Sequence, residues 1–167
     1  PLVNKKGETG IFENTWVHFP WEDSPDVDIA NSVTRVLEFL GENVHREGLV
    51  ETPARVVKSW QKLYGGYDQD VTEILKTFSE ETYDQVVLLK DCEFYSTCEH
   101  HMLPFFGVAH IAYLPRKKII GISKLARILE IYSRRLQIQE RIGEQVTSVL
   151  VRELDCLGAA CIIEAQH

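Results

Sequence analysis

Hydrophobic residues in the first part of the chain recur with the spacing of an α-helix. Pro25-Asp-Val-Asp28 carries a helix-start signal, and apolar residues follow three or four positions apart up to Gly41. Thr52-Pro53 places a capping residue before a proline, which is typical of a second helix, and Gly65-Gly66 ends that pattern. A short third helix is predicted around residues 71–78. We interpret the apolar face of each helix as packing surface.

The pattern changes after Tyr83, where β-branched and alternating residues predict strands. Ser123 is expected to cap a helix, Gly158 to break the helix that follows it, and a strand to close the chain. This order of helices, antiparallel strands, two helices and a strand predicts an α+β fold rather than an alternating doubly wound sheet. The predicted boundaries are strands at 86–89, 94–95, 108–114, 119–121 and 159–165, a turn at 115–118, and a long helix at 137–155.

Composition narrows the class of protein. At 167 residues and 44% hydrophobic content, the chain suffices for one globular domain with a substantial core. A net charge of -7 argues against general affinity for nucleic acid, because a polyanion is repelled. There is no apolar run as long as a membrane span, no signal-peptide pattern, and no disulfide-framework spacing among the four cysteines. We therefore expect a cytoplasmic protein with an extended arm at 1–25 and one domain at 26–167.

The most informative motif is Cys98-Glu99-His100-His101, which lies just before the apolar run 104–107. A thiolate and an imidazole three residues apart suit a tetrahedral zinc ion, because one tight turn can aim both at a common point. His100 stands between them as a further imidazole able to move protons beside the metal. A lone Cys-x-x-His spacing is more often a buried cysteine with histidines that bond loop carbonyls. Three ionisable groups beside an apolar run favour a binding site.

Two predicted helix starts carry further polar groups. Ser123, Lys124 and Arg127 fall within two turns of a helix N-terminus, where free N–H groups already favour an anion such as a triphosphate. An ordinary capped and solvated helix start explains them equally well. Gln139 and Glu140 supply an amide and a carboxylate that can bind the N–H edge of a purine. A charged helix face is the simpler interpretation of that pair taken alone.

Taken together, these segments resemble the GTP cyclohydrolase I family over most of the chain, from Glu51-Thr-Pro-Ala-Arg55 to His167. Several independent motifs in the right order make this likeness far more specific than any one of them. Its strongest parts are Ser96-Thr-Cys-Glu-His-His101, Gly121-Ile-Ser-Lys-Leu-Ala-Arg127 and Arg135-Leu-Gln-Ile-Gln-Glu-Arg141.

The resemblance implies a fold, an assembly and a reaction. The implied fold is a tunnelling (T-fold) domain, a four-stranded antiparallel sheet with two antiparallel helices, plus N-terminal helices. The implied assembly is a homodecamer of stacked rings with active sites between subunits, and a feedback regulatory protein is a further candidate partner. The implied reaction converts GTP to 7,8-dihydroneopterin triphosphate and formate, the entry to folate and pterin biosynthesis.

The resemblance also implies roles for the residues that perform the chemistry. Cys98 and His101 match zinc ligands, His100 and His167 match catalytic histidines, and Ser123 matches a hydroxyl near the ribose. This agrees with the chemistry, because purine C8 is a poor electrophile. Zinc makes water nucleophilic near neutral pH, and an imidazole can protonate the ring nitrogen.

A second group of residues is implied in substrate binding. Glu140 and Gln139 match the residues that hold the guanine ring. Lys124, Arg127 and Arg55 match triphosphate contacts. A carboxylate that accepts from the amide and amino N–H groups of guanine makes a two-point contact that adenine cannot match.

One departure concerns the third zinc ligand of the family, a cysteine two residues beyond the histidine that aligns with His167. The sequence stops at His167 and so contains neither that cysteine nor the basic segment that normally follows it in the family. We therefore expect a truncated version of a longer chain. Two alternatives stay open at this point. One is a non-catalytic subunit that keeps the nucleotide contacts but lacks zinc, and the other is a T-fold relative that acts on another purine or pterin.

Overall fold

The computed structural model describes residues 25–75, 77–78 and 83–166. The chain divides into two compact units between Trp60 and Gln61, and each is described here by itself. The arm expected at residues 1–25 lies outside the described residues except for Pro25, which begins the first helix. Among the described residues, every helix is too short or too polar to cross a lipid bilayer.

The first unit contains the two helices predicted from the apolar spacing. Helix α1 spans Pro25–Phe39 and helix α2 spans Thr52–Leu63, so both predictions are confirmed to within about two residues. Gly41 follows α1 with a φ of 86°, a backbone angle that glycine adopts without steric cost, and its N–H donates to the carbonyl of Glu38 at 2.9 Å.

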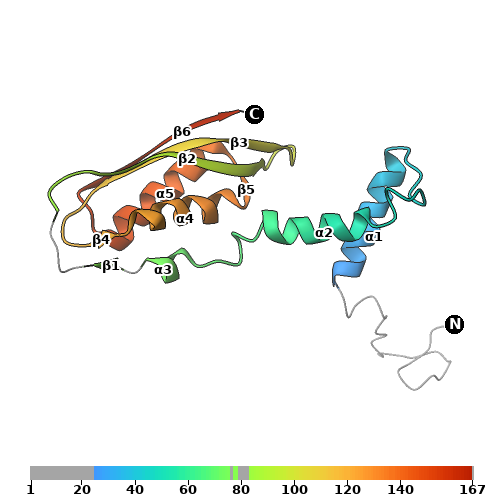
Figure 1. Cartoon of the computed structure of the whole chain (residues 1–167), viewed down its shortest axis with the longest axis horizontal. Helices are drawn as coiled ribbons and strands as arrows, with labels where there is room; N and C mark the ends of the chain where they lie inside the picture. Colours follow the sequence, from blue (N-terminus) through green and yellow to red (C-terminus); the bar gives the residue numbers. More distant parts are fainter. Residues whose placement is uncertain (1–24, 76, 79–82, 167) are drawn as a thin grey trace, which may run out of the picture. The chain divides into compact units, whose positions relative to one another are not determined.

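The second unit is built on a four-stranded sheet (Figure 1). Its strand order is β5-β2-β3-β6, in which β2 (Val87–Cys98), β3 (Pro104–Leu114) and β6 (Gly158–Gln166) are antiparallel neighbours. The two-residue strand β5 (Leu136–Gln137) pairs parallel to β2. The α+β class is confirmed, and the sheet is mixed rather than wholly antiparallel.

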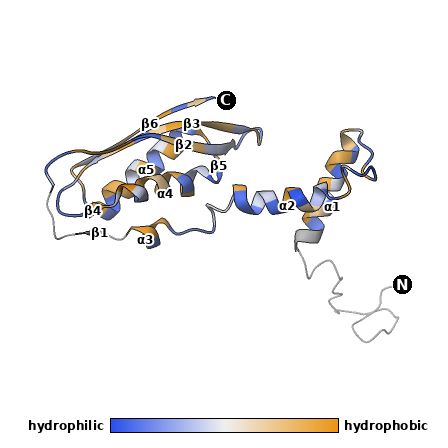
Figure 2. Cartoon of the chain, viewed as in Figure 1, coloured by the Kyte–Doolittle hydropathy of each residue, from blue (hydrophilic) through white to orange (hydrophobic). Residues whose placement is uncertain are grey.

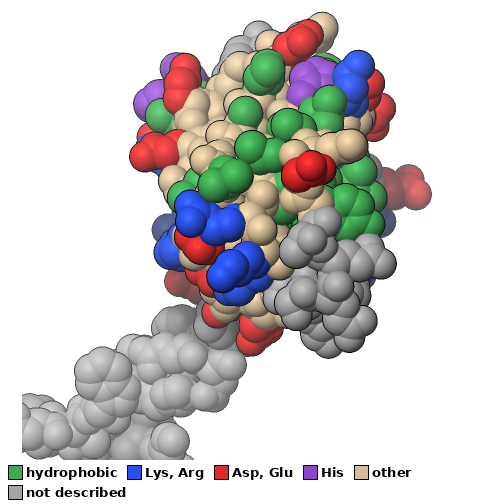
Figure 3. Space-filling model, turned by 90° about the vertical axis from the view of Figure 1, so that its left-hand side faces the viewer, with side chains coloured by type: hydrophobic (Ala, Val, Ile, Leu, Met, Phe, Trp, Pro, Cys, Tyr) green, Lys and Arg blue, Asp and Glu red, His purple; other side chains and the backbone are tan. Residues whose placement is uncertain are grey.

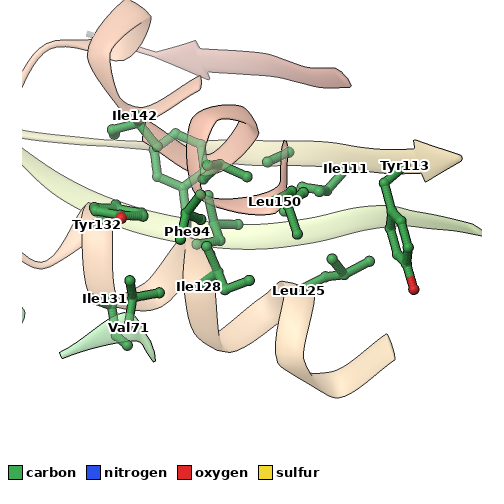
Figure 4. Packing of buried hydrophobic residues seen from close by; sticks show 14 of the residues in the cluster. Val71, Phe94, Ile111, Tyr113, Leu125, Ile128, Ile131, Tyr132, Ile142 and Leu150 are labelled. Carbon is green, nitrogen blue, oxygen red and sulfur yellow. The ribbon is translucent and has the colours of Figure 1, made fainter. Parts of the chain in front are cut away.

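Helices α4 (Ile122–Ser133) and α5 (Gln139–Leu154) cover one face of this sheet (Figure 1). Hydrophobic and hydrophilic residues both occur along the two helices (Figure 2), and the hydrophobic ones supply the core. Leu125 and Leu150 are fully buried beside Phe94 and Ile111 of the sheet (Figure 4). Burial of this apolar surface is the main favourable term that holds the layers together.

Three predicted boundaries on the helices are wrong for identifiable reasons. The short helix α3 stops at Ile74 (Val71–Ile74), because β1 (Thr77–Phe78) pairs with β4 (Ile119–Ile120). Gly121, not Ser123, is the N-cap of α4, because the chain turns directly after β4. Helix α5 begins at Gln139 rather than at residue 137, because residues 136–137 pair with the end of β2.

Glycine is required at two close approaches in the second unit. A Cβ on Gly107 of β3 would lie 1.9 Å from the carbonyl oxygen of Glu164 on β6. A Cβ on Gly66 would lie 2.1 Å from the carbonyl oxygen of Ile131 on α4. These distances are far below van der Waals contact, so any side chain at either position forces the two segments apart.

Arg135 fastens the segment after α2 to the end of α4. Its guanidinium donates to the carbonyl of Gly66 at 2.7 and 3.1 Å, and the Gly66 N–H donates back to the carbonyl of Arg134 at 3.0 Å. The same guanidinium lies over the rings of Tyr67 and Tyr132, at 5.6 and 5.1 Å from their centroids. These contacts combine hydrogen bonding with cation–π attraction at one residue.

Candidate active site

The Cys98–His101 motif forms the turn that joins β2 to β3. The Cys98 N–H donates to the carbonyl of Leu103 and the Met102 N–H donates to the carbonyl of Cys98, both at 2.8 Å. Met102 adopts a φ of 56°, a left-handed angle that lets the chain reverse here. The Sγ atom of Cys98 lies 3.8 Å from Nδ1 of His100 and 3.8 Å from Nδ1 of His101. The turn therefore places two imidazoles beside one thiol, with the two ring centroids 6.1 Å apart.

Glu99, inside the same turn, forms a two-point ion pair with Arg141 of α5. Its Oε1 atom accepts from Nη2 of Arg141 at 3.0 Å, and its Oε2 atom accepts from Nη1. Hydrogen bonding from Arg141 lowers the pKa of the Glu99 carboxyl, and Glu99 in turn raises the pKa of Arg141. Sequence reasoning missed this pair, because the two residues are 42 positions apart and each looks like ordinary surface charge.

Helix α5 begins beside this turn. The Glu99 N–H donates to the carbonyl of Gln137 at 3.0 Å, and Cys98 pairs with Gln137 in the sheet. Gln139 opens the helix, and its side-chain amide donates to the carbonyl of Ile163 on β6 at 2.9 Å. Glu140 follows in the first turn and is exposed. The turn and the two expected guanine-binding residues therefore lie at the same end of the second unit.

Ser123, Lys124 and Arg127 lie elsewhere. Ser123 and Lys124 stand in the first turn of α4, next to β4, whereas the Cys98 turn adjoins β5, which follows the other end of α4 (Figure 1). Helix α4 has 12 residues and is therefore about 18 Å long. Lys and Arg side chains gather on one part of the surface at the β4 end (Figure 3). Within the second unit, the start of α4 with Ser123 and Lys124 is therefore not at the Cys98 turn.

Two expected site residues, Arg55 and His167, have not yet been described. Arg55 is exposed on α2 in the first unit. His167 lies outside the described residues. The other cysteines are free thiols: Cys92 lies in β2 and Cys161 in β6, as expected, and Cys156 is buried. Partial burial raises the pKa of Cys161 to about 11, so this thiol stays protonated at neutral pH.

Comparison with known proteins decides the family. The family model for GTP cyclohydrolase I matches residues 29–167. The chain belongs to the GTP cyclohydrolase I family. Over 142 residues it is 51% identical to the "GTP cyclohydrolase 1" of Wolinella succinogenes, covering 84% of this chain and 76% of the relative. It is 52% identical over 141 residues to that of Parabacteroides distasonis, covering 83% and 72%. The α+β architecture and the assignment as an enzyme of this family both follow.

The zinc ion implied for the GTP cyclohydrolase I family can be tested against the donor atoms of the turn. Zinc bonded to a thiolate at about 2.3 Å and an imidazole at about 2.0 Å holds sulfur and nitrogen about 3.5 Å apart in a tetrahedral site. The 3.8 Å separations from Cys98 fit that spacing for His100 and His101 alike. Within residues 25–75, 77–78 and 83–166, no three side chains of metal-ligating type are grouped to hold an ion. Cys98 and one imidazole of the described turn thus match two ligand positions of a tetrahedral zinc site, and a catalytic site of that kind needs a third.

Proposed function

We propose that this protein converts GTP to 7,8-dihydroneopterin triphosphate and formate, the first step of folate and pterin biosynthesis. The observation that carries the proposal is the grouping of the Cys98 thiol with two imidazoles at 3.8 Å, at the sheet end where α5 starts with Gln139 and Glu140. Membership of the GTP cyclohydrolase I family supplies the substrate class. A metal-binding turn beside a purine-binding carboxylate is the arrangement that hydrolysis at purine C8 requires.

In this proposal each group at the turn has a separate task. Cys98 and His101 would hold zinc, which supplies a Lewis acid for activating water. His100 would donate a proton to the purine ring nitrogen, which makes C8 more electrophilic. The carboxylate of Glu140 would accept from the amide and amino N–H groups of guanine, and Gln139 would support that contact. His167 would act as a second catalytic histidine.

The triphosphate and the ribose would be held by a second group of residues. Lys124, Arg127 and Arg55 would neutralise the phosphates, and Ser123 would lie near the ribose as it opens. Ser123 and Lys124 stand at the opposite end of α4 from the Cys98 turn, which favours a site completed by a second copy of the chain. This supports a homo-oligomer, proposed as a decamer. Helix α1 offers surface for such contacts, since Val36, Phe39 and Leu40 are exposed at its end.

Three further points complete the proposal. The match over residues 29–167 supports one functional domain at 26–167. Four free thiols support a reducing, cytoplasmic location. A feedback regulatory protein would be an additional partner.

The activity is tested with the full-length protein, zinc and GTP. We expect formate release together with a pterin product that becomes fluorescent after oxidation. GTP binding without formate would instead indicate the non-catalytic alternative. Release of formate from another purine, but not from GTP, would indicate a relative with a different substrate.

The shared site is tested by mixing two inactive variants. Cys98→Ser removes the metal turn and Lys124→Ala removes a phosphate contact, each from its own chain. If one copy supplies the turn and another the start of α4, dissociation and co-assembly in equal amounts restores about a quarter of the wild-type activity, the statistical share of intact sites. If each chain forms its own site, the mixture stays inactive.

A further inference from the structure

The turn that carries Cys98, His100 and His101 is joined by hydrogen bonds to α5 and to the segment just before it. Its own backbone hydrogen bonds, between residues 98 and 102–103, close the turn on itself. The Glu99 N–H bond to Gln137 and the short β5 pairing reach the segment just before α5. The Glu99–Arg141 pair is a side-chain contact that reaches the helix itself. The setting of the turn against α5 therefore depends strongly on this pair.

The geometry of the pair suits a positioning role. A guanidinium that meets both carboxylate oxygens fixes distance and orientation together, unlike a lysine at the same place. Arg141 is adjacent to Glu140 in the first turn of α5, so a constraint on Arg141 is also a constraint on the neighbouring carboxylate. The Glu99 and Arg141 side chains are 30% and 37% exposed, which leaves the pair partly shielded from water.

From this arrangement we propose that Glu99 and Arg141 are positioning residues that hold the Cys98–His101 turn at a fixed distance from Glu140. The inference rests on the proposed function, because it assumes that Glu140 holds the purine while the turn acts on C8. Neither residue of the pair needs to touch the substrate. Their effect is to keep the Cys98–His101 turn and Glu140 at the separation that the reaction needs. A displacement of about 1 Å between reacting groups can lower the rate by about a hundredfold.

The role predicts a specific division between kcat and KM. In Arg141→Lys the charge stays but the two-point geometry is lost, so guanine still binds Glu140 while the turn is less well placed. We expect kcat to fall by about 10- to 100-fold, with KM changed by less than about threefold. Binding of a non-hydrolysable GTP analogue, measured by calorimetry, should stay within the same threefold range. Glu99→Gln should show the same division, since the amide keeps only one acceptor for the arginine.

Arg134 provides a matched control. It caps the C-terminal end of α4 and pairs with Glu130 at 2.5 Å as an i,i+4 pair, and it takes no part in the turn's contacts with α5 described above. Arg134→Lys makes the same substitution in an ion-paired arginine, and kcat should stay within about twofold of wild type. The double variant Glu99→Gln/Arg141→Lys should lose no more rate than the worse single variant, because both changes break one unit.

The outcomes separate this inference from the proposed function. If the wild-type chain with zinc releases no formate from GTP, the proposed function fails. If wild type is active and both single variants keep the wild-type kcat, the positioning role is overturned. A rise in KM without a fall in kcat would overturn it as well. An equal loss in Arg134→Lys would also overturn it. Should Arg141→Lys fail to fold by circular dichroism, Glu99→Gln alone decides the matter, since it preserves shape and one hydrogen bond.

Discussion

Gln139 donates its side-chain amide to the main-chain oxygen of Ile163 at 2.9 Å. The bond ties the first residue of α5 to β6, the strand that leads to His167. The resemblance to the GTP cyclohydrolase I family implies that this glutamine helps to hold guanine. The structure gives its nitrogen a prior partner in the sheet, so its first effect is on how α5 and β6 fit together.

Gln139→Glu tests that linkage. A carboxylate cannot donate, so the Ile163 carbonyl loses a partner and faces a negative charge. We expect the free energy of unfolding to fall by about 1–3 kcal/mol, measured by urea denaturation. Gln145→Glu is the matched control, because Gln145 accepts through its oxygen from Gln137 Nε2 at 2.7 Å and a carboxylate can still accept. Equal destabilisation of both variants would contradict the role given to the Gln139 amide.

Glu140→Gln addresses substrate recognition. The substitution keeps the shape but replaces one acceptor with a donor that would face the guanine N–H groups. We expect affinity for a GTP analogue to fall by about 10- to 100-fold in calorimetry, the usual cost of an unpaired polar group in a binding site. Glu144→Gln, one turn along α5 and exposed, should bind normally. Unchanged binding by Glu140→Gln would remove this residue from the purine site.

Cys98→Ser tests the metal. Because zinc binds a thiolate far better than a hydroxyl, the full-length variant should lose both stoichiometric zinc and formation of the pterin product. Cys92→Ser, on the same strand, should keep both. Elemental analysis with formate release measures the outcome, and a zinc-loaded Cys98→Ser variant would show that the ligands lie elsewhere.

The partly buried thiol of Cys161 predicts a pH dependence of stability. Burial raises its pKa from about 9.0 to about 11, so the unfolded chain ionises first as pH rises. Its stabilising effect is therefore complete below pH 9 and is lost progressively between pH 9 and 11. Urea unfolding of wild type and Cys161→Ala across this range should show a steeper decline for wild type. Parallel curves would contradict the assignment.

Gly107→Ala tests the close approach of β3 to β6. The added Cβ would meet the Glu164 carbonyl at 1.9 Å, so the strands must separate or the variant must misfold. We expect a loss of more than about 2 kcal/mol in unfolding free energy, as for other strained or overpacked sites. Gly158→Ala, at the start of β6 with no atom within 4 Å of the new Cβ, should be nearly neutral. Similar thermal stability of the two variants would show that the strands accommodate a side chain.

Local sequence patterns predicted what depends on neighbours in the chain. The apolar spacing gave α1 and α2, and the Cys98-x-x-His101 spacing placed the thiol and imidazole together, because both depend on one short segment. Gln137 was assigned to a helix and instead pairs with Cys98, since the sheet edge outweighs helical preference there. The Glu99–Arg141 pair and the separation of Lys124 from the turn were not predictable, because both depend on how distant elements run past each other.

The contact between Arg135 and Gly66 has a consequence for the order in which the chain can fold. It joins residues 69 positions apart, and Gly66 rests against the end of α4. During synthesis the segment after α2 leaves the ribosome long before this arginine exists. Contacts between distant residues form only after the intervening chain has been ordered. The segment around Gly66 and Tyr67 can therefore bind Arg135 only once α4 has been completed and has docked on the sheet. Loss of the Arg135 guanidinium would then slow the last step of folding more than the first.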